Sequence, residues 1–224
     1  MPLKRMRGRM SSRRRSNAVA TGSSTRSVVI GRIAHRRITD SANEADPQRA
    51  LENIRRTYKA GDTDLAWTRL TNWRIQLAAA LDQDSSPVTA VTVEGASDSP
   101  STILLAAWLT LALDAPVTIV ADPAGTGIRR VRLTRTGGDI QLFRPGLTVA
   151  ELSQPGQPVQ RISLPRRSLK DCLAEELRRL DPDEVFGETL RNLGTAPMPH
   201  EGLETLIVKK EQGQDLSLSH LVSI

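Results

Sequence analysis

The sequence has little of several residue classes that mark particular kinds of protein. It contains a single cysteine, which excludes an internal disulfide and leads us to expect a reducing compartment, the cytoplasm. Aromatic residues make up only 3% of the 224 residues, so leucine, valine, isoleucine and alanine must form most of the core. No run of 18 apolar residues occurs, and we therefore expect no membrane partner and no membrane-spanning segment.

Histidine is also scarce, and His35, His200 and His220 lie in three unrelated segments. Their surroundings show no HExxH motif, no cysteine–histidine zinc spacing and no Ser–His–Asp order. The Gly125-Thr126-Gly127 stretch does not fit a nucleotide-binding loop either, because a strand rather than a helix is predicted after it. We therefore expect no metal, no cofactor and no enzymatic activity.

Positive charge is concentrated at the start of the chain. Residues 1–28 hold eight of the 31 lysines and arginines and no acidic residue, which leaves 23 basic against 25 acidic residues elsewhere. This first segment has no hydrophobic period and is predicted to be a disordered basic tail. The rest is close to neutral, so we do not expect nucleic acid as a partner.

The most informative stretch runs from Gly95 to Leu113. From Ile103 onward it is apolar on every side except at Thr110, which is typical of a buried helix. Pro100 suits the first helical turn, and the serine before it suits the N-cap. The segments on both sides are rich in β-branched residues and predict strands, at Val88–Glu94 and Pro116–Ala121.

The pattern then changes to a period of two, which predicts an antiparallel meander. Its four strands are expected at Gly127–Arg135, Asp139–Arg144, Leu147–Leu152 and Val159–Leu164. Together with the strand–helix–strand unit they predict an α+β fold with a mixed sheet of about six strands and flanking helices. The expected organisation is a helical connecting segment over 29–82, an α+β domain over 83–194 and a mostly irregular tail over 195–224.

Four further helices are predicted from apolar stripes and capping residues. They span Pro47 to about Gly61, Thr63–Leu81, Leu169–Leu180 and Pro182–Leu193. In the third of these, Cys172 falls on an apolar stripe with four leucines and is expected in the core. The acidic residues nearby are expected on a solvated helix face, and they are Glu175, Glu176, Asp181, Asp183 and Glu184.

Two sets of residues are candidates for binding. Trp67 and Arg74 share one flank of the helix predicted over Thr63–Leu81, and both residue types are enriched at interfaces, so they are candidate partner contacts. The alternative is that Trp67 packs inside and Arg74 covers it. The second set, at the start of the central helix, is a candidate anion or ligand site, with helix capping as its alternative: Ser97, Asp98 and Ser99.

Four long strings occur in an order that resembles one known family. They are Arg36–Asp40 (RRITD), Gly61–Arg74, Val93–Leu109 and Leu173–Leu190. The chain is similar to OpcA, the glucose-6-phosphate dehydrogenase assembly protein family of actinobacteria and cyanobacteria, from about Gly31 to Leu193. Family members carry a further domain before the RRITD segment, and the resemblance implies that it is missing here.

The resemblance implies a non-enzymatic role with no catalytic residues to carry over. Its expected partner is the oligomeric glucose-6-phosphate dehydrogenase of the oxidative pentose phosphate pathway, whose assembly or activation it would promote by protein–protein contact. Two alternatives stay open. One is a domain that senses a phosphosugar at Ser97–Ser99, and the other is a truncated family member that folds without activating the dehydrogenase.

Overall fold

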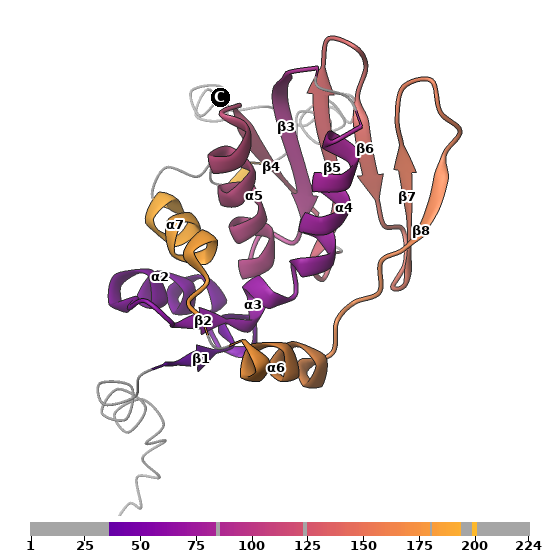
Figure 1. Cartoon of the computed structure of the whole chain (residues 1–224). Helices are drawn as coiled ribbons and strands as arrows, with labels where there is room; N and C mark the ends of the chain where they lie inside the picture. Colours follow the sequence, from indigo (N-terminus) through magenta and orange to yellow (C-terminus); the bar gives the residue numbers. More distant parts are fainter. Residues whose placement is uncertain (1–35, 84–85, 123–124, 180, 194–198, 201–224) are drawn as a thin grey trace, which may run out of the picture. The chain divides into compact units, whose positions relative to one another are not determined.

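The computed structural model describes residues 36–83, 86–122, 125–179, 181–193 and 199–200. Its larger sheet has the strand order β8-β7-β6-β5-β3-β4-β9 (Figure 1). The strands are β3 (Val88–Gly95), β4 (Val117–Ala121), β5 (Ile128–Arg135), β6 (Ile140–Phe143), β7 (Val149–Ser153), β8 (Gln160–Ser163) and β9 (Pro199–His200). β3 is parallel to β4 and antiparallel to β5, and the meander continues antiparallel to β8. The expected mixed α+β fold is confirmed, and β9 adds a two-residue parallel pairing at the β4 edge.

Helix α5 (Pro100–Leu113) joins β3 to β4 and occupies the range predicted for the central helix. Half of its 14 residues are buried, as expected of a helix that has no polar face to turn toward water. Ser99 occupies the N-cap position, but its side chain makes no capping hydrogen bond, which corrects the expected role of this hydroxyl. No helix within the described ranges is long and apolar enough to cross a membrane.

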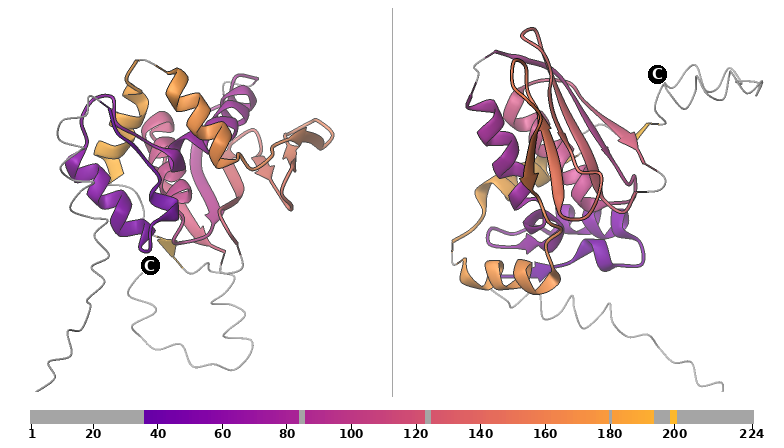
Figure 2. Two further views of the ribbon diagram at one scale, coloured as in Figure 1. Left: turned by 90° about the horizontal axis from the view of Figure 1, so that it is seen from below. Right: turned by 90° about the vertical axis from the view of Figure 1, so that its right-hand side faces the viewer.

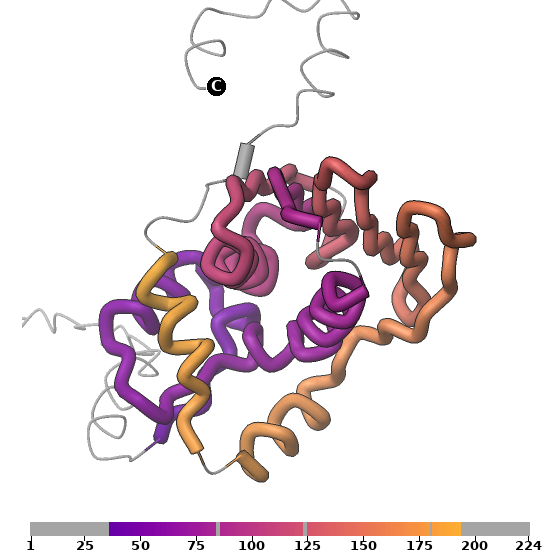
Figure 3. Tube along the Cα trace, turned by 45° about the horizontal axis from the view of Figure 1, so that its top comes forward, coloured from indigo at the N-terminus to yellow at the C-terminus, as the bar shows by residue number. Residues whose placement is uncertain are grey.

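One face of the sheet carries the core. Figures 2 and 3 show α4 (Thr71–Leu81) and α5 side by side against this face. Alternate residues of β3, such as Val91 and Val93, point into the same core as the apolar residues of both helices. The opposite face is polar: Arg130 pairs with Glu94 at 3.1 Å and lies 4.7 Å from the Phe143 ring centroid. Alternation of this kind is typical of a sheet with one solvated face.

The single helix predicted over Thr63–Leu81 is corrected by the structure. The range contains three elements, β2 (Thr63–Asp64), α3 (Leu65–Thr68) and α4. Thr63 and Asp64 pair instead with β1 (Ile38–Thr39), so helix formation begins only at Leu65. A turn at Arg69 and Leu70 then separates α3 from α4. Both helices contribute to the core shared with the sheet.

The RRITD string holds distant elements together. Arg36 donates to Glu176 Oε2 at 2.6 Å, and Arg37 donates through Nε to Asp62 Oδ2 at 3.0 Å. Asp40 accepts two hydrogen bonds from Arg69, at 2.6 and 2.8 Å. Each charged side chain of the string therefore pairs with a residue far along the sequence, which explains a dense run of polar residues without invoking chemistry.

Asp64 is buried at the centre of a hydrogen-bonded cluster with Thr39, Ser41 and Ala66, which we call the clasp. Its carboxylate accepts hydrogen bonds from the hydroxyl of Thr39, from the backbone and hydroxyl of Ser41, and from the backbone of Ala66. These bonds tie together β1, the short 3₁₀ helix η1 (Ser41–Asn43) and the start of α3. Helix α2 (Pro47–Thr57), which lies between η1 and β2 in the sequence, begins at a similar N-cap residue, Asp46. The Asp46 carboxylate accepts a hydrogen bond from Arg49 N–H.

Gly95 allows three elements to converge at one end of the sheet. A Cβ atom at this position would lie 2.8 Å from Thr102 Oγ1 of α5 and 2.9 Å from the Gly127 carbonyl oxygen before β5. Distances this short are not tolerated against backbone, so only glycine fits here. The end of β3, the start of α5 and the start of β5 are thereby brought close together.

The last two helices are α6 (Leu169–Arg178) and α7 (Glu184–Asn192). The predicted cap of α6 is confirmed, since Ser168 Oγ accepts from Asp171 N–H at 3.1 Å. Its expected core stripe is only partly correct. Cys172 is buried, but Glu176 takes the next buried position because Arg36 and Thr68 bind its carboxylate. Three of the four leucines of the expected stripe form an exposed row, which we call the leucine row: Leu169, Leu173 and Leu177. The fourth, Leu180, lies outside the described residues.

Candidate functional site

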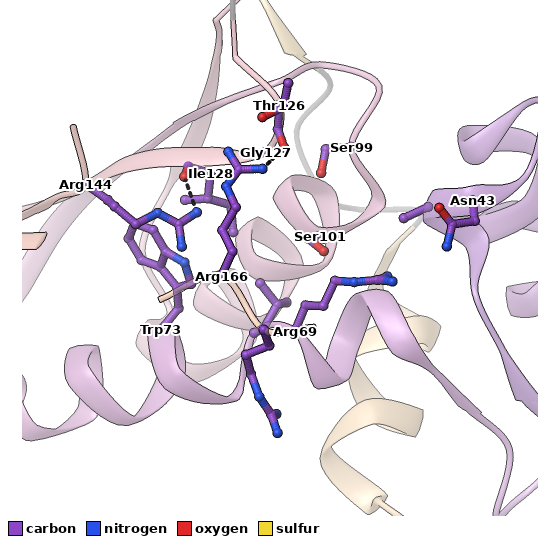
Figure 4. Close-up of a pocket in the computed structure, with 13 residues that line it drawn as sticks. Asn43, Arg69, Trp73, Ser99, Ser101, Thr126, Gly127, Ile128, Arg144 and Arg166 are labelled. Carbon is purple, nitrogen blue, oxygen red and sulfur yellow. Dashed lines mark hydrogen bonds between the residues drawn. The ribbon is translucent and has the colours of Figure 1, made fainter. Parts of the chain in front are cut away.

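A pocket of about 270 Å³ lies where the start of β5 and the end of β6 meet the start of α5 (Figure 4). Residues from η1, from the turn before α4 and its first residues, and from the segment between β8 and α6 complete its wall. We call it the arginine pocket, because four of its lining residues are arginines and none is acidic. The arginines are Arg69, Arg144, Arg166 and Arg167, and the lining hydroxyl residues are Ser99, Ser101 and Thr126.

Arg144 is buried because of its place in the sheet. It directly follows β6, and its backbone N–H continues the ladder by donating to the Arg129 carbonyl at 2.8 Å. Side chains two residues apart on a strand share a face, so Arg144 lies on the core face together with Ile140 and Leu142. Only 7% of its surface is exposed. Burying a charged side chain costs free energy unless hydrogen bonds or an opposite charge compensate for the lost water.

The partners of Arg144 are all neutral. Nη2 donates to the Ile128 carbonyl at 3.0 Å and Nη1 to the Leu164 carbonyl at 3.4 Å, while the guanidinium lies 5.1 Å from the Trp73 ring centroid. Its buried Nε has no hydrogen-bond partner among the described residues. Burial, with a further contribution from the charge of Arg166, lowers the pKa of Arg144 to about 10. The guanidinium is therefore still charged at neutral pH.

The other three arginines differ in how their charge is balanced. Arg69 holds Asp40, and the hydrogen bonds between them raise the pKa of Arg69. Arg167 pairs with Glu175 at 2.5 Å. Arg166 donates to the Thr126 carbonyl at 2.7 Å. Within the described ranges no carboxylate lies at ion-pair distance from Arg166 or Arg144, so the pocket carries an excess of positive charge.

The structure separates the three residues predicted as an anion or ligand site. Ser99 lines the arginine pocket, whereas Ser97 and Asp98 are exposed and do not line it. The Ser97 carbonyl instead accepts a hydrogen bond from the Gln48 side chain at 2.9 Å. Of the three residues only Ser99 lines the arginine pocket, and an anion or ligand site at Ser97–Ser99 stays a prediction.

The same pocket contains residues that sequence reasoning missed. Arg144 and Arg166 lie 22 positions apart and belong to segments predicted as strand end and loop. A weak signal was present, because Arg144 falls on the apolar phase of its strand, where a charged side chain is out of place. The convergence of both arginines on the start of α5 depends on the sheet order and could not be inferred from spacing.

Trp67 lies in the core and not at the surface. Its side chain has 0% exposure, and its ring centroid is 5.6 Å from that of Phe186. The Arg74 guanidinium lies 3.8 Å from the ring centroid, and Nε1 donates to Asp183 Oδ2 at 2.9 Å. The partner contact expected at Trp67 is therefore corrected, because the indole presents no surface. A partner contact at Arg74, which is only half-buried, stays a prediction.

Two charged residues next to the indole, Asp183 and Arg74, have pKa values that differ from their ordinary values. Burial alone would raise the pKa of Asp183, but hydrogen bonds from Trp67 and from Phe186 N–H, together with the charges of Arg179 and Arg74, lower it below its ordinary value. The pKa of Arg74 is lowered, chiefly by burial. Asp183 also caps α7. Asp183 therefore joins the indole to α7 and is not an exposed surface carboxylate.

The expectation that the acidic cluster is a solvated face is also corrected for two of its members. Glu176 is 2% exposed and binds Thr68 Oγ1 at 2.7 Å as well as Arg36, and the Asp183 side chain is largely buried. Cys172, by contrast, lies in the core as predicted, and burial raises the pKa of its thiol. The side chains of Glu176, Asp183 and Cys172 therefore help to hold α6 and α7 against the rest of the described structure.

Comparison with known proteins identifies one family. Its description is the C-terminal domain of a glucose-6-phosphate dehydrogenase subunit, and it matches residues 60–190. No curated protein sequence matches the chain.

Solved structures with some similarity include a mutant of KijD10, a 3-ketoreductase from Actinomadura kijaniata, in complex with TDP-benzene and NADP. It has a TM-score of 0.42 and 11% identity, over 74% of this chain and 71% of that chain. The same reductase in complex with NADP has a TM-score of 0.41 and 12% identity, over 69% and 66%. Similarity at this level assigns neither a fold nor an activity to this chain.

Proposed function

This chain belongs to the family of glucose-6-phosphate dehydrogenase C-terminal subunit domains, and on that premise we propose that it binds glucose-6-phosphate dehydrogenase and promotes assembly or activation of the oligomeric enzyme. The observation that carries the proposal is the family match over residues 60–190, which covers α3 through most of α7. The proposal assigns binding surfaces to the chain and no catalytic residue.

The leucine row supports a protein partner and suggests where it binds. Leu169, Leu173 and Leu177 are 52%, 38% and 65% exposed, and their spacing of four places them along one side of α6. A contiguous apolar row on an exposed helix is characteristic of a protein-interaction surface, whereas single exposed leucines need no explanation. We therefore propose that the leucine row contacts the dehydrogenase.

Replacing all three leucines of the row with glutamine should weaken binding of the dehydrogenase by about tenfold or more, because the apolar contact is lost. The substitutions are at exposed positions, so the melting temperature should change little. Sedimentation velocity of the dehydrogenase with increasing amounts of the chain measures both binding and the oligomeric state of the enzyme. The matched control replaces two exposed apolar residues of the β7–β8 region, Leu147→Gln with Val159→Gln, and should bind like the parent chain.

Three results would contradict this account. If the triple variant binds as tightly as the parent, the leucine row is not the contact. If the parent chain self-associates and the triple variant does not, the row joins two copies of this chain instead. If the parent neither binds the dehydrogenase nor changes its oligomeric state, the proposed function is wrong for this chain, as expected of a truncated member that only folds.

A further inference from the structure

The arginine pocket has a charge imbalance that the proposed association does not use. Asp40 and Glu175 balance Arg69 and Arg167, whereas Arg144 and Arg166 have only carbonyl partners among the described residues. Carbonyl oxygens satisfy donors but bring no negative charge. Two guanidinium groups beside one pocket without a carboxylate for either are an arrangement that an anion would stabilise.

Of these two arginines, Arg144 gives the stronger evidence for a bound anion. It is more than nine-tenths buried, lines the pocket, and has a buried Nε with no partner among the described residues. Leaving a buried polar group unpaired costs free energy, and the lowered pKa of Arg144 expresses the same cost for its charge. A bound anion would offset this cost, whereas bulk solvent reaches little of the side chain.

The opposite wall offers groups suited to an oxyanion and to hydroxyls. The 14-residue helix α5 begins at the pocket, and a helix N-terminus favours negative charge. Ser99 Oγ makes no capping bond and can donate, while Ser101 Oγ donates to the Ala66 carbonyl and can still accept. Figure 4 shows these serines across the pocket from Arg166 and Arg144.

We propose that the arginine pocket binds a small phosphate monoester, with the phosphoryl group held by Arg166 and Arg144 and hydroxyls of the ligand held by Ser99 and Ser101. Guanidinium groups recognise phosphate by paired, charge-assisted hydrogen bonds. A volume of about 270 Å³ lies just below the range of about 300–1,000 Å³ that is usual for small-molecule sites, which favours a single-ring sugar phosphate over a dinucleotide. This inference does not rest on the proposed association with the dehydrogenase.

Isothermal titration calorimetry of the full chain with glucose 6-phosphate tests the proposal. Saturable binding is expected for glucose 6-phosphate and 6-phosphogluconate, weaker binding for inorganic phosphate, and none for glucose. Arg166→Gln should weaken binding of glucose 6-phosphate by about tenfold or more. The control Arg132→Gln removes an exposed arginine of β5 outside the pocket and should leave affinity unchanged.

A second variant guards against a loss of folding in the first. Ser99→Glu places a carboxylate at the pocket in a position where the native side chain makes no capping bond, and it should also abolish binding. The proposal is overturned if no phosphate compound binds saturably, or if both pocket variants bind like the parent. It is also overturned if Arg132→Gln weakens binding as much as Arg166→Gln, which would indicate diffuse charge attraction.

Two ligand comparisons test the assigned chemistry. Equal affinity for inorganic phosphate and glucose 6-phosphate would overturn the assignment to an ester, and preferential binding of NADP would overturn the single-ring ligand. Failure of this proposal is distinguishable from failure of the proposed function. Loss of ligand binding in Arg166→Gln is measured without the dehydrogenase, and the leucine row lies on residues that do not line the pocket.

Discussion

Replacing Trp67 with alanine should lower the free energy of unfolding by about 3–5 kcal/mol, the range for removing a large buried aromatic side chain. The indole is fully buried against Phe186 and is covered by Arg74. Its removal leaves a cavity between α3 and α7 and deprives Asp183 of a hydrogen-bond donor. The half-buried charge of Arg74 also loses the ring over which it lies, a further loss.

Urea unfolding followed by circular dichroism measures this effect. Trp67→Phe retains an aromatic ring but loses the hydrogen bond to Asp183, so its stability should lie between the parent and the alanine variant. Ile75→Ala on α4 is the matched control, since this side chain is 55% exposed and should change stability by less than about 0.5 kcal/mol. A Trp67→Ala variant within about 1 kcal/mol of the parent would show that the indole is not part of the core.

Replacing Asp64 with alanine should cost about 3 kcal/mol or more, because four hydrogen bonds, three of them buried, lose their acceptor at once. The groups left unpaired are the Ser41 hydroxyl and two backbone N–H groups, whereas the Thr39 hydroxyl can still donate to the Thr63 carbonyl oxygen. They lie in the clasp that joins β1 and η1 to α3. Loss of the clasp should therefore also release the segment around Arg36 from α6.

The chain offers a matched control for this substitution. Asp46 caps α2 by one hydrogen bond but is exposed, so Asp46→Ala should cost only about 1 kcal/mol. Both variants can be compared in the same urea titration. If the two substitutions cost the same, Asp64 acts as an ordinary helix cap and the buried clasp contributes nothing further.

Local signals were sufficient to predict the sheet and its central helix. Pro100 marks the start of α5, and the absence of a polar face between Ile103 and Leu113 predicts its burial. The alternation from Gly127 onward predicts β5 and β6, because one face of the sheet is buried and the other is solvated. Each of these elements is predicted by a pattern of residues that are close together in the sequence.

Elements governed by distant contacts could not be predicted in this way. The helix expected from Thr63 begins later because Thr63 and Asp64 pair with β1, 25 positions earlier in the sequence. Glu176 is buried because Arg36 reaches it from the other end of the described chain. In both cases a tertiary hydrogen bond overrides the local helical period.

The candidate sites show the same limit. Trp67 and Arg74 do share one flank, as the helical period predicts, but Phe186 of α7 packs against the indole and Arg74 covers it, so Trp67 lies in the core. The arginine pocket unites residues from six segments, so no short motif could reveal it. Among its residues the sequence indicates Ser99, through the helix start that anions favour, and gives a weak signal at Arg144, a charged residue on the apolar phase of its strand.

Hydrogen–deuterium exchange of the chain with and without glucose-6-phosphate dehydrogenase tests the central claim most directly. A partner seated on the leucine row should slow exchange of the backbone amides of α6, Leu169–Arg178, while the solvated face of β5 and β6 exchanges as before. Protection confined to α6 and its immediate neighbours is the predicted result. Unchanged exchange across α6 in the presence of saturating dehydrogenase would contradict the account.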